Sequence, residues 1–474
     1  MRDQIDPQSP TLTTANWRGT NTGSRRTRPR RYAPMKLGYD DPLACRTALR
    51  DGSVSALDMV NKALARIDAS DAEIRAFAWC DPDAARRDAE ALDRGRGSVG
   101  PGALHGMPVA LKDVVDTAGI PTENGVAADR GRVPAADAVL VERLRAEGAL
   151  LLGKTVTAEL AFLSPGATRN PANLAHTPGG SSSGSAAAVA AGMVPFAIGT
   201  QTGGSVIRPA SFCGIVGYKP TFGAIPRTGV LSQSPSLDTI GVFAQTVAGA
   251  ALVAEPLFGE DAGDTASLRA SRPALLDAAL NPAPSVRLAF VPPPEWESHA
   301  QPETRAAFAQ LRDALGELCG DGALPDCFGT AAATRLAINL AEMAHEFRRY
   351  AGGETSAALQ EALAAGAQVT APDYLAARAH QRGLAAALDP IFDGADAIVT
   401  PAALGAAPLG IGSTGDSLFN GLWTLAGVPA ITVPLLTSPE GLPLGVQLVG
   451  PVGADAHLLR TAAALERWAV HALR

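Results

Sequence analysis

The amino-acid sequence predicts an α/β protein, because segments with the apolar spacing of strands alternate with segments with the spacing of helices along most of the chain. Two features of the composition agree with a large folded protein of this class. Hydrophobic residues make up 46% of the 474 residues and charged residues 18%, so the chain can bury a sizeable core. Aromatic residues make up only 5%, and we therefore expect a core built from Ala, Leu, Val and Ile.

Helix and strand signals follow one another through the first half of the chain. Ser55 with Asp58 is typical of a helix start, and apolar residues follow at helical spacing. The segment "MPVALKDVV" alternates like a strand and places Lys112 inside it. The other elements expected here are a strand and a helix in 76–95 that ends at Gly95, a helix, a glycine stop and a buried strand in 137–155, a helix after Ser185, and a strand in 193–200.

The second half gives fewer strand signals. Residues 255–330 are richer in Pro and turn residues, and 331–388 are predicted to be mostly helical. Three further strands are expected in "DAIVTPAAL", "ITVPLL" and "LPLGVQLVGP".

The domain organisation follows from the absence of a visible linker after Met35. The sequence predicts a disordered basic tail over 1–34, which has no periodic apolar face, and a single domain over 35–474. Within that domain we expect a core over about 50–250 and 390–474 and a helical, substrate-shaping region over about 255–390.

Charge and cysteine usage exclude several classes of partner at this stage. The formal net charge is −7, which argues against a nucleic-acid partner, since such binding relies on basic patches. The five cysteines show no zinc spacing and no disulfide framework, which favours a cytoplasmic protein without a metal site. No apolar run reaches the length of a membrane-spanning helix, so we expect no membrane partner.

Two Gly/Ser-rich loops are the strongest functional signal. The first is "HTPGGSSSGSAAAVAAGM" (176–193), and the second is "GTQTGGSVIRPASFCG" (199–214). Together with "LHGMPVALKD", "SLDTIGVFAQTV" and "GVPAITVPLLTSPEGLPLGVQLVGP", these segments resemble the amidase signature family, in the same order and over roughly Met35 to the C-terminus. The resemblance implies a large central mixed β-sheet flanked by helices on both faces.

The resemblance also assigns roles to residues. It implies that Ser205 is the nucleophile, that Ser181 is a bridging serine held by a cis peptide bond, and that Lys112 is the base. The chemistry is consistent, because a serine hydroxyl is a weak nucleophile that needs a neighbouring base. Burial of Lys112 between apolar residues would favour its neutral form, and the hydroxyl of Ser181 can pass a proton between the other two groups.

The second loop is expected to stabilise the oxyanion that forms when an amide carbonyl is attacked. The backbone N–H groups of Thr202, Gly203, Gly204 and Ser205 are the candidate donors.

The residues expected to contact the substrate are Arg208, Gln201 and Gly180. Two of these depart from the family pattern: Gln201 stands where the family commonly has an acidic residue, and Arg208 is one position late. Arg208 could hold a substrate carboxylate or anchor the loop through a structural contact, and the sequence leaves both open.

These residues predict a cofactor-free hydrolase that cleaves the C–N bond of a small molecule, an amide or a carbamate, urea or hydrazide, through an acyl-enzyme on Ser205. One alternative is the glutamine-hydrolysing subunit of a tRNA-dependent amidotransferase, which also belongs to this family. Another is an α/β-hydrolase-type esterase that uses Ser182, since "GSSSG" (180–184) fits the pattern of a nucleophile elbow. The family often forms homodimers, so a homodimer is left open.

Overall fold

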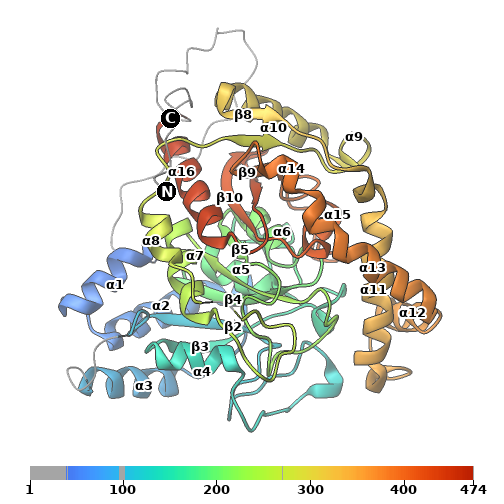
Figure 1. The fold of residues 1–474 in the computed structure, drawn as a ribbon. Coiled ribbons are helices and arrows are strands. Elements are labelled where there is room, and N and C mark those ends of the chain that lie inside the picture. The colour runs from blue at the N-terminus through green and yellow to red at the C-terminus, as the bar shows by residue number, and fades with distance from the viewer. Residues whose placement is uncertain (1–38, 40, 96–101, 270, 473–474) are drawn as a thin grey trace.

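A computed structural model gives the fold of this chain and describes residues 39, 41–95, 102–269 and 271–472 (Figure 1). The predicted basic tail over 1–34 lies outside the described residues. The predicted α/β class is confirmed, because a large mixed sheet is packed between helices. The predicted division of the chain into a tail and one domain stays a prediction.

The sheet has 11 strands in the order β1-β3-β2-β4-β6-β5-β10-β11-β9-β7-β8. It is mixed, because β2 pairs in parallel with β3 and β4, whereas the pairs β4–β6, β6–β5, β5–β10 and β10–β11 are antiparallel. The strands are β1 Phe77–Cys80, β2 Pro108–Lys112, β3 Leu150–Thr155, β4 Phe196–Gln201, β5 Val216–Lys219, β6 Thr239–Ala244, β7 Leu288–Phe290, β8 Cys319–Asp321, β9 Ala397–Pro401, β10 Ala430–Thr437 and β11 Pro443–Val449.

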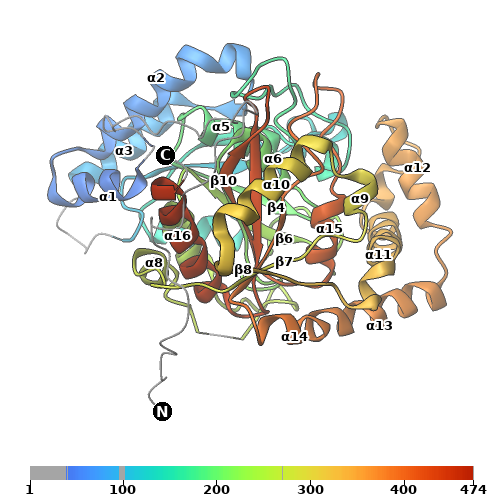
Figure 2. The same cartoon turned by 90° about the horizontal axis from the view of Figure 1, so that it is seen from above.

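Helices lie on both faces of the sheet and at its ends (Figures 1 and 2). They are α1 Pro42–Asp51, α2 Ala56–Ile74, α3 Pro82–Arg94, α4 Val139–Ala146, α5 Ser183–Ala190, α6 Ile207–Cys213, α7 Val247–Ala254, α8 Leu275–Leu280, α9 Trp296–His299, α10 Pro302–Leu315, α11 Ala331–Glu346, α12 Ala357–Gly366, α13 Ala371–Ala387, α14 Asp389–Phe392, α15 Leu418–Leu425 and α16 Asp455–Ala472. Within the described part of the chain, no helix is both long enough and apolar enough to cross a membrane.

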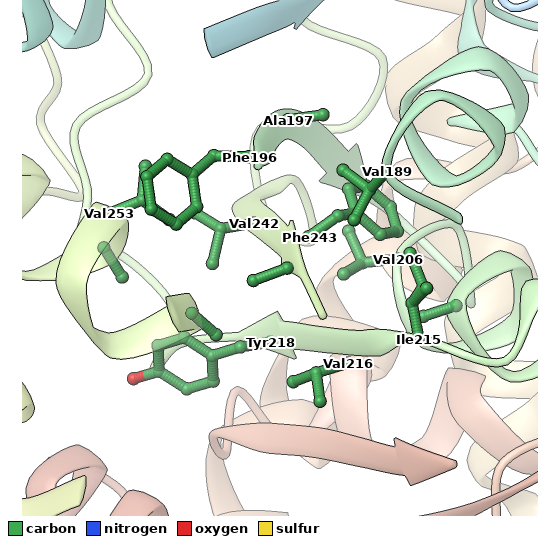
Figure 3. Close-up of a cluster of buried hydrophobic side chains, with 14 of the residues drawn as sticks. Val189, Phe196, Ala197, Val206, Ile215, Val216, Tyr218, Val242, Phe243 and Val253 are labelled. Carbon is green, nitrogen blue, oxygen red and sulfur yellow. The ribbon is translucent and has the colours of Figure 1, made fainter. Parts of the chain in front are cut away.

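The main hydrophobic core fills both sides of the sheet. On β6 the neighbouring residues Val242 and Phe243 are fully buried and point to opposite faces, as strand alternation requires (Figure 3). Phe243 lies on the side of Val189 in α5, and Val242 lies on the side of Val253 in α7 (Figure 3). The strands at the centre are therefore fixed from both sides, which makes them a rigid support for the loops at their ends.

Local sequence signals account for several element boundaries. Ser55 caps α2, and its side chain and that of Asp58 form the reciprocal hydrogen bonds of a capping box. The region 255–330, which is rich in Pro and turn residues, contains the 14-residue helix α10 and also the short strands β7 and β8, which were not expected. These strands have three residues each, which is too short for an alternation signal to be read.

Parallel pairing positions the candidate site. Strands β2 and β4 are parallel neighbours with Leu111 opposite Ile198, so they end at the same edge of the sheet. Lys112 is the last residue of β2, and Thr200 lies near the end of β4. Their side chains therefore meet at this edge, where the two Gly/Ser-rich loops also lie.

Candidate active site

Lys112 is the centre of the site. Its side chain is 0% exposed, and its Nζ donates hydrogen bonds to Ser181 Oγ at 2.7 Å and to Thr200 Oγ1 at 2.8 Å. Burial lowers the pKa of Lys112 to about 7, and the carboxylate of Asp238 opposes this shift. Half of the amines are therefore neutral near pH 7, as a general base requires. The structure brings together Lys112 and Ser181, two of the residues to which the resemblance assigned roles.

Ser181 lies in the first Gly/Ser loop just before α5. The Gly180–Ser181 peptide bond is cis, and the side chain of Ser181 is buried at 1% exposure. The carbonyl of Ser181 accepts a hydrogen bond from Ala158 N at 3.0 Å. The hydroxyl of Ser181 is thus held beside Lys112, and the backbone of the same residue is held by Ala158.

Ser205 lies in the second loop, between β4 and α6, and its side chain is 9% exposed. No hydrogen bond joins its hydroxyl to Ser181 or to any other described residue. The two loops are instead tied by Arg208, whose Nη2 donates to Gly180 O at 2.6 Å.

The second loop presents backbone donors that have no partner. The N–H groups of Gly203, Gly204 and Ser205 make no hydrogen bond to a described residue, although the neighbouring N–H groups of Val206 and Ile207 do. Unpartnered donors beside a candidate nucleophile are the arrangement that an oxyanion hole needs.

Gly204 shows why this loop contains glycine. A Cβ atom at this position would lie 2.4 Å from Asn420 Oδ1, so the backbone can pass α15 only without a side chain. The close approach holds the loop against α15, and Thr424 of the same helix donates to Gly203 O at 2.7 Å.

Gln201 supports the loop from inside the protein. It is 1% exposed, and its Oε1 accepts hydrogen bonds from Val206 N at 2.8 Å and Ile207 N at 3.0 Å. Its Nε2 donates to Thr424 Oγ1 at 3.0 Å. Gln201 was expected to contact substrate, but all of these polar contacts go to the protein, and they give the residue a structural role.

Arg208 makes the anchoring contact that the sequence left open. Its guanidinium is 4% exposed and donates to Gly180 O and to Thr414 Oγ1 at 3.3 Å. Burial lowers its pKa to about 10. Its Nε has no hydrogen-bond partner among the described residues.

Three polar residues of the site were missed from the sequence. Thr200 accepts a hydrogen bond from Lys112, and Asp238 accepts one from Thr202 Oγ1 at 2.5 Å. Burial raises the pKa of Asp238 to about 6. Glu342 of α11 accepts hydrogen bonds from Ser234 Oγ at 2.5 Å and Ser236 N at 3.0 Å, and so holds the loop that carries Asp238. "SLDTIG" is the only local signal that pointed toward this group.

Ser182 does not have the surroundings of a nucleophile elbow. Such an elbow needs a strand directly before the serine, whereas the described segment 170–182 contains no strand. The Oγ of Ser182 donates to Thr200 O at 3.2 Å and accepts from Thr200 N at 3.3 Å. Its hydroxyl thus joins the two loops and is 0% exposed.

Comparison with known proteins agrees with this site. The profile of the family described as Amidase matches residues 58–459. A glutamyl-tRNA(Gln) amidotransferase subunit of Synechococcus sp. (strain WH7803) is 35% identical over 89% of this chain and 96% of its own length. The native peptide amidase of Stenotrophomonas maltophilia has a TM-score of 0.77 at 31% identity, over 91% of this chain and 96% of its own. A 6-aminohexanoate cyclic dimer hydrolase has a TM-score of 0.80 at 29% identity, over 91% and 97%.

One expectation is corrected by these relatives. The net charge of −7 led us to expect no nucleic-acid partner, but relatives 34–36% identical are named as a subunit of an amidotransferase for glutamyl-tRNA(Gln). That expectation was wrong because net charge describes the whole surface and does not exclude a local contact with nucleic acid or with a subunit that binds it. The family match over most of the chain, the shared fold and the relatives agree, and this chain is an enzyme of the amidase family, whose members hydrolyse C–N bonds.

Proposed function

We propose that the chain cleaves an amide through an acyl-enzyme on Ser205. The observation that carries the proposal is the buried Lys112, whose pKa is about 7 and which is hydrogen-bonded to Ser181 beside a loop with unpartnered N–H donors. Neutral Lys112 takes a proton from Ser181, which takes the proton of Ser205 as Ser205 Oγ attacks the carbonyl carbon.

The remaining steps use the same groups. The N–H groups of the loop at Thr202, Gly203 and Gly204 stabilise the oxyanion, together with that of Ser205. The C–N bond then breaks, and the leaving nitrogen receives the proton that Lys112 holds. A water molecule attacks the ester while Lys112 again accepts a proton, which releases the acid and restores Ser205.

The setting that the relatives support best is the glutamine-hydrolysing subunit of a tRNA-dependent amidotransferase. This support comes from relatives 34–36% identical that are named as a glutamyl-tRNA(Gln) amidotransferase subunit; they align over 93–96% of their own length. In this setting the chain works with partner subunits and glutamyl-tRNA, in the cytoplasm, and the ammonia released from glutamine is the product passed on.

An amidase that acts alone on a small molecule is the second candidate. It is supported by the likeness to the solved peptide amidase and to the cyclic dimer hydrolase, at 29–31% identity. Carbamates, ureas and hydrazides fit the same chemistry.

The experiment that tests the chemistry compares the wild-type chain with Ser205→Ala, Lys112→Ala and Ser181→Ala on glutamine and on a panel of small amides. We expect Ser205→Ala and Lys112→Ala to lose turnover and Ser181→Ala to be severely impaired, while circular dichroism shows that each variant folds. Wild-type activity in Ser205→Ala would refute the acyl-enzyme.

The same assay separates the two settings. Ammonia release from glutamine is measured for the chain alone and after addition of the other amidotransferase subunits and glutamyl-tRNA. Release that needs these additions supports the amidotransferase setting, and turnover of small amides by the isolated chain supports the independent amidase.

A further inference from the structure

A pocket lies between α11 and α15. Arg335 of α11 and Gly421 of α15 line it, together with Phe328 and Glu295. The two helices lie side by side in both views of the fold (Figures 1 and 2). Nothing in the mechanism proposed above uses this pocket.

Arg335 brings an uncompensated positive charge into the pocket. Its guanidinium makes no hydrogen bond and no ion pair with a described residue, although the side chain is half-buried. Burial lowers the pKa of Arg335, and Asp416 opposes the shift without coming within ion-pair distance. A charge withdrawn from water costs free energy unless it is paired, so an unpaired guanidinium in a pocket indicates an anionic ligand.

The surroundings of Arg335 leave room for the guanidinium and direct it toward the loop. A Cβ atom at position 421 would lie 2.4 Å from Arg335 Nε, so the glycine of α15 is needed for this placement. A Cβ atom at position 203 would lie 3.4 Å from Arg335 Nη1. The charged group therefore lies beside Gly203 in the loop that holds Ser205.

This placement limits where the anionic group of a ligand can be. Gly203 and Ser205 are two residues apart, so their Cα atoms are separated by at most about 7 Å. An anion on Arg335 thus lies within a few bonds of a carbonyl carbon that Ser205 attacks. The planar guanidinium fits a carboxylate, which it can bind with two parallel hydrogen bonds.

We infer that Arg335 binds a carboxylate carried by the substrate, and that the enzyme therefore prefers amides with a carboxylate a few bonds from the scissile carbonyl. The inference rests on the proposed acyl-enzyme at Ser205, because that residue fixes the position of the carbonyl. Glu295 lines the same pocket and repels an anion, so it cannot be the source of this preference.

The test uses matched substrates and variants. The substrates are monoamides of dicarboxylic acids with three to six carbons, glutamine, and neutral amides of the same chain lengths. Arg335→Gln removes the charge, Gly421→Ala displaces the guanidinium, and Arg382→Gln, at an exposed position of α13, is the control. Charge-assisted hydrogen bonds contribute about 1.5–3 kcal/mol, so Arg335→Gln should lower kcat/KM on the anionic amides roughly 10- to 100-fold.

The pattern across the panel decides the outcome. The inference is supported if Arg335→Gln and Gly421→Ala weaken turnover of the anionic amides and change the neutral amides less than about threefold, with Arg382→Gln unchanged. An equal loss on both classes of amide, or a wild-type enzyme that does not distinguish them, overturns it.

Calorimetry separates this inference from the acyl-enzyme proposal. Succinamate, the four-carbon monoamide, is titrated into Ser205→Ala and into Ser205→Ala with Arg335→Gln. The inference is supported if succinamate binds to Ser205→Ala but not to the double variant that also carries Arg335→Gln. This result would support it even if turnover by the wild-type enzyme does not use Ser205. Equal affinity of the two variants, or no binding to either, overturns it.

Discussion

At the scale of single residues, the protonation of Lys112 determines whether the enzyme can work. Its pKa of about 7 predicts that kcat/KM rises with pH through about 7, because only the neutral amine accepts a proton. Asp238 favours the charged amine, so Asp238→Asn lowers the pKa of Lys112. We expect the acidic limb of the kcat/KM profile to move to lower pH in this variant.

The same variant tests a second role of Asp238. Its carboxylate holds the hydroxyl of Thr202, and an asparagine can keep that contact if the hydroxyl turns. The profile of Asp238→Asn is measured against that of Asp264→Asn, since Asp264 lies in an ion pair with Arg227 and has no contact with Lys112. An acidic limb that stays in place, or moves to higher pH, contradicts the electrostatic role of Asp238.

At the scale of elements, the carboxylate of Glu342 connects helices α11 and α13 to the loop that carries Asp238, and Asp238 in turn binds Thr202 of the second Gly/Ser loop. Glu342 of α11 binds Ser234 and Ser236, Tyr374 of α13 donates to Glu342 at 2.7 Å, and the loop they hold carries Asp238. Glu342→Gln replaces one of the two acceptor oxygens with an NH2 donor, which then faces groups that donate to the carboxylate in the wild type. We expect kcat to fall about tenfold with little change in KM, because a displaced Asp238 disturbs Thr202 of the second Gly/Ser loop, whose N–H groups act on the transition state.

The comparison variant for this element is Tyr374→Phe, which removes one hydrogen bond to Glu342 and leaves the contacts to Ser234 and Ser236. Its kcat should fall less than that of Glu342→Gln. A lower melting temperature with an unchanged kcat in Glu342→Gln would assign the contact to stability alone.

The sequence predicted the elements that local chemistry determines. The capping box at Ser55 and the strand that contains Lys112 depend on adjacent residues, although that strand ends at Lys112 and not after it as predicted, and the Gly/Ser loops could be recognised from their motifs. Glu342 and Arg335 could not be found in this way. Each lies on a helix with ordinary periodicity and meets the site through residues that are more than 100 positions away in the chain. Only the packing of α11 on the loops reveals their surroundings.

At the scale of the whole molecule, a comparison of two fully buried lysines with similar pKa values distinguishes effects on catalysis from effects on stability. Lys112 lies in the active site, whereas Lys219 at the end of β5 donates to Pro220 O at 3.0 Å and Val428 O at 2.6 Å. Burial lowers the pKa of each to about 7. In the unfolded chain both are protonated up to about pH 10.

Between pH 7 and about 10 the unfolded chain therefore binds one more proton at each of these lysines than the folded protein does. The free energy of unfolding then rises with pH, by about 1.4 kcal/mol per pH unit for each lysine. Lys219→Met should remove one such contribution, while the pH profile of kcat/KM stays that of wild type. Lys112→Met should remove a contribution of the same size and abolish turnover.

Urea unfolding at pH 7, 8 and 9 measures the slope of the free energy of unfolding against pH for each variant. A Lys219→Met protein whose slope equals that of wild type would show that Lys219 keeps its proton in the folded state.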